Sequence, residues 1–160
     1  MTDNPTAEGG PTLVPDVALV LPRSEFVYEA LVDIAPNTAI GEAPLGRRFI
    51  VPILGGSFAG PRIRGRVMPG GADRQLQRRD GMKSLDALYE LQTEDGAIIT
   101  VHNRVLIDTA VTDSPYQFST LDITAPNGPH AWLNRGVFIG MRHGLPPTRK
   151  AVLIRVFQVV

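Results

Sequence analysis

Two short segments concentrate the residues that could do chemistry, and the first holds Gly70, Gly71 and Asp73, followed by Asp80-Gly81. Glycine pairs let the backbone come close to a ligand or to another part of the chain. A carboxyl group beside them can act as a general acid or base, or anchor a ligand. The same pattern also fits a tight turn in which Asp73 bonds to its own backbone. We predict Asp73 as a catalytic carboxyl, with the turn as the structural alternative.

The second segment runs from His130 to Arg135 and contains the single Trp of the chain. Read as a strand, it places His130, Trp132 and Asn134 on one face, because alternate side chains share a face. Trp supplies an apolar wall, and Asn and His supply donors and acceptors, as in small-molecule pockets. This predicts His130 and Asn134 as catalytic residues and Trp132 as a substrate-binding residue. The alternative is that Trp132 fills the core and Asn134 begins a bulge or a turn.

A row of arginines adds a third feature, because Arg62, Arg64 and Arg66 share one face of an expected strand. Inside a barrel this row would be a cationic lining for a carboxylate or an enolate. Outside, it would be a solvated face. We count Arg66 and Tyr89 among the predicted substrate-binding residues.

The composition excludes several classes of protein. The 160 residues include 16 Lys+Arg, 16 Asp+Glu, three His and no Cys. A neutral chain lacks the basic surface of a general nucleic-acid-binding protein, and a chain without Cys has no disulfide scaffold and no cysteine nucleophile. The histidines have no close metal-ligand spacing, so no metal site is predicted. No complete P-loop and no G-x-S-x-G motif is present, and no cofactor is predicted.

Period-two patterns predict strands through most of the chain, and 16 Gly with 14 Pro suit short strands joined by turns. A helical turn is considered only at 73–79, and Glu94-Asp95-Gly96 predicts a hairpin turn. The expected strands include 25–33, 47–54, 62–68, 84–92, 97–107, 116–123, 130–141 and 150–160.

About nine antiparallel strands must hide their edges, and closure into a barrel does this most completely. The predicted fold is all-β, a single antiparallel up-and-down barrel of the calycin or lipocalin type over 16–160. A two-sheet sandwich is the alternative. Residues 1–15 are polar and rich in Pro and Gly, and we predict a flexible arm there. A barrel of this size can hold one small ligand.

The ends of the chain suggest where the protein acts. The first residues have no basic region followed by an apolar one, so they do not read as a signal peptide. No apolar run approaches the roughly 20 residues of a membrane helix. We expect a cytoplasmic protein with a small-molecule partner, and neither nucleic acid nor membrane.

The apolar C-terminal strand ending at Val160 could pair within the barrel or at the edge of a homo-oligomer.

Several segments together resemble an uncharacterised family, the domain of unknown function numbered 3237. The similarity extends from about Phe26 to Val160. Its segments, in order, are Gly65-Arg66-Val67, Gly70-Gly71-Ala72-Asp73, Asp80-Gly81, Leu85-Asp86-Ala87-Leu88-Tyr89, Thr93 to Ile99, Pro115 with Phe118 and Thr120, and Ala131-Trp132-Leu133-Asn134. The resemblance implies a calycin-like barrel with a pocket and leaves the function open.

These features lead to a prediction of a small-molecule-binding barrel that acts as a cofactor-independent isomerase, lyase or cyclase. The reaction would be acid–base chemistry on an activated carbonyl compound, with Asp73 moving the proton. Asn134, His130 and Arg66 would steady the oxyanion, and Trp132 and Tyr89 would pack the substrate. One alternative is a non-catalytic, lipocalin-like carrier of a hydrophobic small molecule. Another is an interaction module with a filled barrel.

Overall fold

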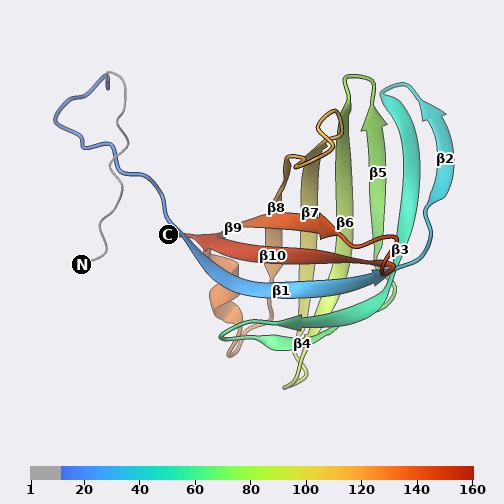
Figure 1. Ribbon diagram of the computed structural model, residues 1–160. Helices are drawn as coiled ribbons and strands as arrows, with labels where there is room; N and C mark the ends of the chain where they lie inside the picture. Colours follow the sequence, from blue (N-terminus) through green and yellow to red (C-terminus); the bar gives the residue numbers. More distant parts are fainter. Residues whose placement is uncertain (1–11) are drawn as a thin grey trace.

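The computed structural model describes residues 12–160, and strands form most of this range (Figure 1). The elements are β1 (Ser24–Ile34), β2 (Thr38–Ala43), β3 (Gly46–Ala59), β4 (Arg64–Val67), β5 (Ala72–Arg78), β6 (Met82–Thr93), β7 (Ile98–Asp108), β8 (Gln117–Thr124), the short 3-10 helix η1 (Ala131–Arg135), β9 (Val137–Gly144) and β10 (Ala151–Val159).

The strands close into an antiparallel barrel. Strands β1, β10, β9, β8, β7 and β6 pair in that order, β4 and β5 both join β6 to β3, and β3 pairs with β1 to complete the circuit. Strands β1, β9 and β10 run across the direction of β5, β6 and β7 (Figure 1), as expected of a strongly twisted closed sheet. The predicted all-β antiparallel barrel is therefore confirmed, and β2 extends β3 as an additional strand.

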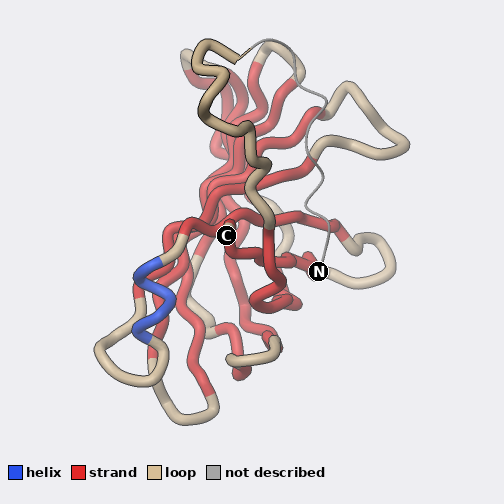
Figure 2. The backbone as a smooth tube through the Cα atoms, turned by 90° about the vertical axis from the view of Figure 1, so that its left-hand side faces the viewer, coloured by secondary structure: helices blue, strands red, loops and turns tan. Residues whose placement is uncertain are grey.

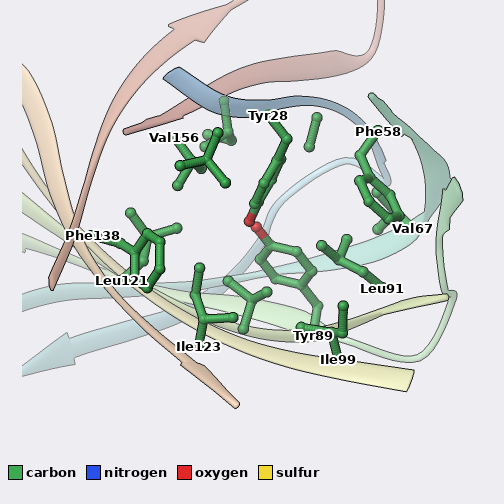
Figure 3. Close-up of a cluster of buried hydrophobic side chains, with 14 of the residues drawn as sticks. Tyr28, Phe58, Val67, Tyr89, Leu91, Ile99, Leu121, Ile123, Phe138 and Val156 are labelled. Carbon is green, nitrogen blue, oxygen red and sulfur yellow. The ribbon is translucent and has the colours of Figure 1, made fainter. Parts of the chain in front are cut away.

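The inside of the barrel has two apolar clusters. The larger one surrounds Tyr28, Tyr89 and Leu91 (Figure 3), and the smaller one consists of Leu85, Val105 and Ile107. Because inward side chains alternate along each strand, the residues between these clusters on β5, β6 and β7 also face the interior. Several of these intervening residues are polar.

Close packing of the strands depends on glycine at the barrel seam. Gly56 lies opposite Val32 where β3 joins β1, and its φ is +134°. A Cβ added there would lie 2.0 Å from the carbonyl oxygen of Leu31. Side chains larger than hydrogen are thus excluded by the partner strand as well as by the backbone conformation.

The structure corrects three local predictions. Residues 73–78 belong to strand β5 and residue 79 lies in the turn after it, so 73–79 do not form a helical turn. Strand β2 was not predicted, and ten strands replace the expected nine or so in residues 12–160. The predicted strand 130–141 is wrong in its first half, because residues 131–135 form η1, seen as the helical segment at one end of the barrel in Figure 2. The predicted Asp-Gly turn at 94–96 is confirmed between β6 and β7, where Gly96 has a φ of +90°.

The predicted arm at 1–15 falls largely outside the described residues. Residues 12–15 are exposed, and β1 begins at Ser24. Within residues 12–160, no helix is long and apolar enough to cross a membrane.

Candidate functional site

A layer of polar side chains lies inside the barrel between the two apolar clusters. The strand register places Asp73 opposite Ala87 on β6, and Ala87 opposite Asn103 on β7. Gln75 follows two residues after Asp73 and therefore shares its inward face. Strands β5 and β7, which lie on either side of β6, thus bring a carboxyl and two amides to one side of the interior.

This polar layer borders a cavity of about 50 Å³. Its lining residues are Val32, Ile34, Val51, Ile53, Asp73, Gln75, Ala87, Tyr89, Asn103, Arg142, Val152 and Ile154. Apolar walls with a few converging polar groups are typical of small-molecule sites. The volume is that of a few atoms, so it suits the reactive end of a ligand better than an entire one.

Asp73 is held at the cavity by two hydrogen bonds. The Gln75 side chain donates from Nε2 to Oδ2 at 2.7 Å, and the backbone N–H of Asp86 donates to Oδ1 at 3.0 Å. Burial raises the pKa of the Asp73 carboxyl above its usual range, although these hydrogen bonds and the charges of Arg142 and Lys83 act in the opposite direction. A carboxyl with a raised pKa moves toward the range in which it can exchange protons with a substrate at neutral pH.

Two cationic side chains face this carboxyl. Arg142, on β9, lines the cavity and donates from Nη1 to Oε1 of Gln117 at 2.8 Å. Lys83 lies on the inward face of β6, four residues before Ala87. Burial lowers the pKa of both groups, and the charge of Asp73 partly offsets this effect. The interior therefore carries two cations and one carboxyl in close electrostatic contact.

Asn103 and Tyr89 complete the polar layer. The Oδ1 atom of Asn103 is buried and has no hydrogen-bond partner among the described residues, which is costly unless a ligand or water supplies one. The hydroxyls of Tyr89 and Tyr28 face each other (Figure 3), and burial raises the pKa of both phenols. Tyr89 therefore offers the cavity the side of its ring.

Of the predicted site residues, the structure brings only Asp73 and Tyr89 together at this cavity. Arg66 lies on the outer face of β4, where its Nε donates to Oε1 of Gln92 at 2.9 Å. Of the two alternatives for the arginine row, a cationic interior lining or a solvated outer face, the structure shows the solvated face. His130, Trp132 and Asn134 lie in and next to η1 and are absent from the cavity lining.

The residues around η1 make contacts of their own. The His130 Nε2 lies 2.9 Å from Oδ1 of Asp95 in the β6–β7 turn, and the Arg62 guanidinium lies 3.9 Å from the centre of the Trp132 ring. These pairs attach η1 to neighbouring loops. A prediction that placed His130 and Trp132 on one strand face with Asn134 required a strand where the chain forms a helical turn.

Asn134 fastens η1 to the residue after β8. Its Oδ1 accepts from the Ala125 N–H at 2.8 Å, and its Nδ2 donates to the Ala125 carbonyl at 2.9 Å. We expect Asn134→Ala to lower the free energy of unfolding by about 1–3 kcal/mol, because it leaves both backbone groups without this partner. Chemical denaturation measures the effect. An unchanged unfolding midpoint would contradict the structural role, and His143→Ala, at an exposed position, is the control.

The raised pKa of Asp73 predicts how the stability of the protein depends on pH. Its folded-state pKa is raised, so its contribution to stability is present below the unfolded pKa and is lost as the pH rises through the folded pKa. We expect Asp73→Asn to have a higher free energy of unfolding than the parent at pH values above the folded-state pKa, and we expect this difference to shrink as the pH falls. The free energy of unfolding measured from pH 4 to pH 8 tests this, and parallel curves would contradict it.

A larger groove of about 600 Å³ lies on the outer side of the same strands, with lining that includes Pro44, Arg48, Arg74 and Asp86. Its side chains are mostly exposed, and Asp86 is already 2.7 Å from Nε2 of His102. The inner cavity has the titratable group whose pKa burial raises, so we take it as the candidate site.

Sequence reasoning missed Arg142, Lys83, Asn103 and Gln75. Asn103 was visible as a polar residue within the inward alternation of β7, between Val101 and Val105. Arg142 continues the alternation of Phe138 and Gly140 on β9. Polar residues that interrupt an apolar face were the available signal, and they mark the interior more reliably than polar residues clustered along the chain.

The comparisons agree with this architecture. The family described as protein of unknown function (DUF3237) matches residues 22–159. The chain belongs to this family. A UPF0311 protein of Rhodopseudomonas palustris is 40% identical over 81 residues, which is 51% of this chain and 53% of that protein. The chain thus spans about half the length of that curated relative.

Solved structures of similar proteins have the same fold. The crystal structure of a conserved Rhodopseudomonas palustris protein of unknown function superposes with a TM-score of 0.81 at 28% identity, covering 89% of this chain and 100% of that one. A protein of Acinetobacter baumannii described as beta-barrel like gives a TM-score of 0.77 at 27% identity, covering 88% and 97%.

One relative of the DUF3237 chain has a named activity. A hydroalkoxylation enzyme of Penicillium herquei is 29% identical over 113 residues, which is 71% of this chain and 69% of that enzyme.

Proposed function

We propose that this DUF3237 protein binds a small activated carbonyl compound at the inner cavity and catalyses proton transfer or addition–elimination on it without a cofactor. The observation that carries the proposal is the carboxyl of Asp73, partly buried inside the barrel at a cavity that a guanidinium and an unpartnered amide oxygen also line. Groups with perturbed pKa values in a cavity are typical of catalytic sites.

The chemistry fits the addition of a hydroxyl group across a conjugated double bond. The Asp73 carboxylate would take the proton of the attacking hydroxyl as the new C–O bond forms and the π bond breaks. The protonated carboxyl would then return that proton to the α-carbon, so that atoms and charge balance. The Arg142 guanidinium stands where it could stabilise negative charge on the carbonyl oxygen.

The hydroalkoxylation enzyme among the relatives supports this reaction class, because hydroalkoxylation is the addition of an O–H bond across a double bond. An isomerisation or a lyase reaction uses the same proton transfers and stays within the proposal. The proposal gives no part to His130, Asn134, Trp132 or Arg66, because none of them lines the cavity. Cytoplasmic location and homo-oligomerisation stay predictions.

The test is a panel of α,β-unsaturated carbonyl compounds that carry a tethered hydroxyl group. We expect the protein to accelerate ring closure of at least one of them and to give one enantiomer in excess. Equal rates with and without protein across the panel, together with a ligand that stays bound through desalting in native mass spectrometry, would instead favour the carrier alternative.

A further inference from the structure

Within the described part of the chain, the two cations inside the barrel have no carboxylate partner, whereas several cations on the outer surface do. On the outer surface Arg64, Arg104 and Arg155 contact Glu94, Asp122 and Glu29 at 3.4, 2.8 and 3.1 Å. Among the ion pairs of residues 12–160, neither Arg142 nor Lys83 appears. A partly buried cation without a counter-charge is unfavourable, because it has lost water without gaining a partner.

Asp73 does not neutralise both groups. It is the single carboxyl among the cavity-lining residues, and its oxygens already accept from Gln75 and the Asp86 backbone. Arg142 uses Nη1 on the neutral amide of Gln117, which leaves other guanidinium donors for a ligand. The interior therefore has an excess of positive charge with donors to spare.

An aromatic ring lies beside Lys83. The Lys83 Nζ lies 5.6 Å from the centre of the Phe49 ring, and the Arg47 guanidinium lies 5.3 Å from it. Phe49 pairs with Gln75 across β3 and β5, and Gln75 in turn hydrogen-bonds to Asp73. The Phe49 ring thus lies on the strand next to the polar layer, opposite Gln75.

We propose that the site selects a substrate that is anionic when it binds, such as a carboxylate, an ionised phenol or an enolate. Arg142 and Lys83 bind the negative group, and Phe49 packs against the adjoining planar part. This inference rests on the proposed function for the location of the site, and it adds the charge class of the substrate. Charge-assisted hydrogen bonds to Arg and Lys supply the preference for an anion over its neutral analogue.

Benzoate and benzamide form a matched pair of probes, since they share shape and differ in charge. We expect benzoate to bind the full chain at least about tenfold more tightly than benzamide in an NMR titration at neutral pH, with shifts at Arg142, Lys83 and Phe49. Arg142→Gln and Lys83→Gln should each remove most of that preference, whereas Arg142→Lys retains part of it. Arg64→Gln, which deletes a charge from the outer surface, is the control.

The result separates this inference from the proposed function. Asp73→Asn should leave benzoate binding intact or tighten it, because it removes a nearby negative charge, while it abolishes turnover. Benzoate preference with turnover that is insensitive to Asp73 would refute the catalytic role and keep the anion site. Equal binding of benzoate and benzamide, or a preference unchanged in Lys83→Gln, would overturn the anion site. If Arg142→Gln does not fold, Lys83→Gln carries the test.

Discussion

Replacement of Asp73 by Asn is expected to lower the turnover number about 10²–10⁴-fold, because the amide can neither take nor return a proton. The hydrogen bonds that hold the residue can survive the change. The Asn oxygen can accept from the Asp86 N–H, and Gln75 can turn its amide to accept from the new amino group. Binding of a substrate analogue should therefore change much less than turnover.

The measurement is kcat and KM on a substrate that the panel identifies, with thermal unfolding run in parallel. Asp122→Asn is the matched control, because Asp122 is an exposed carboxyl on β8 that pairs with Arg104 outside the barrel. Turnover within a factor of about three of the parent in Asp73→Asn would remove this carboxyl from the chemistry. A pH–rate profile of the parent should show one ionisation above the usual range of Asp, and the variant should lack it.

Gly56→Ala is expected to produce the largest loss of stability. The added methyl meets the Leu31 carbonyl oxygen at 2.0 Å across the β1–β3 pairing, and the backbone φ of +134° is unfavourable for alanine. Backbone strain of this kind costs about 1–3 kcal/mol, and forced overpacking adds roughly 1–3 kcal/mol or more. Small domains have a total free energy of unfolding of only about 5–15 kcal/mol. The variant should therefore unfold at a much lower denaturant concentration or fail to accumulate as folded protein.

Gly128→Ala separates the two contributions. Gly128 has a similar φ of +137°, but an added Cβ there meets nothing within 4 Å. It should therefore pay only for backbone strain. Equal losses of unfolding free energy in the two variants would show that the contact across the seam is unimportant.

Most of the fold was accessible from the sequence because apolar residues alternate on most of the strands that close the barrel. Strand β5 was missed because its alternation is reversed. Its inward residues are Asp73, Gln75 and Gln77, while Leu76 faces outward. Strand β2 has no buried position, so it lacks the pattern altogether. The polar inward residues that made β5 hard to predict also form part of the candidate site.

The site was only partly accessible for the same physical reason. Asp73 stood out through its glycine neighbours, but Asn103 and Arg142, which line the same cavity, lie on β7 and β9, distant from it along the chain. The segment 130–135, with one His, one Trp and one Asn close together, was predicted as part of the site instead, and its side chains attach η1 to its surroundings. Proximity along the chain is a poor guide in a barrel, where neighbours arise by cross-strand pairing.

The pairing of β10 has a consequence for the order of folding. Strand β10 lies between β1 and β9, and Val159 pairs with Ser24. During synthesis, β1 therefore emerges long before the strand that covers one of its edges, and the circuit stays open until β10 leaves the ribosome. We therefore expect interior charges such as Arg142 and Asp73 to stay accessible to water until β10 closes the circuit. Nascent chains that stop short of β10 should thus expose an unpaired β1 edge, and they are the species most prone to misassembly.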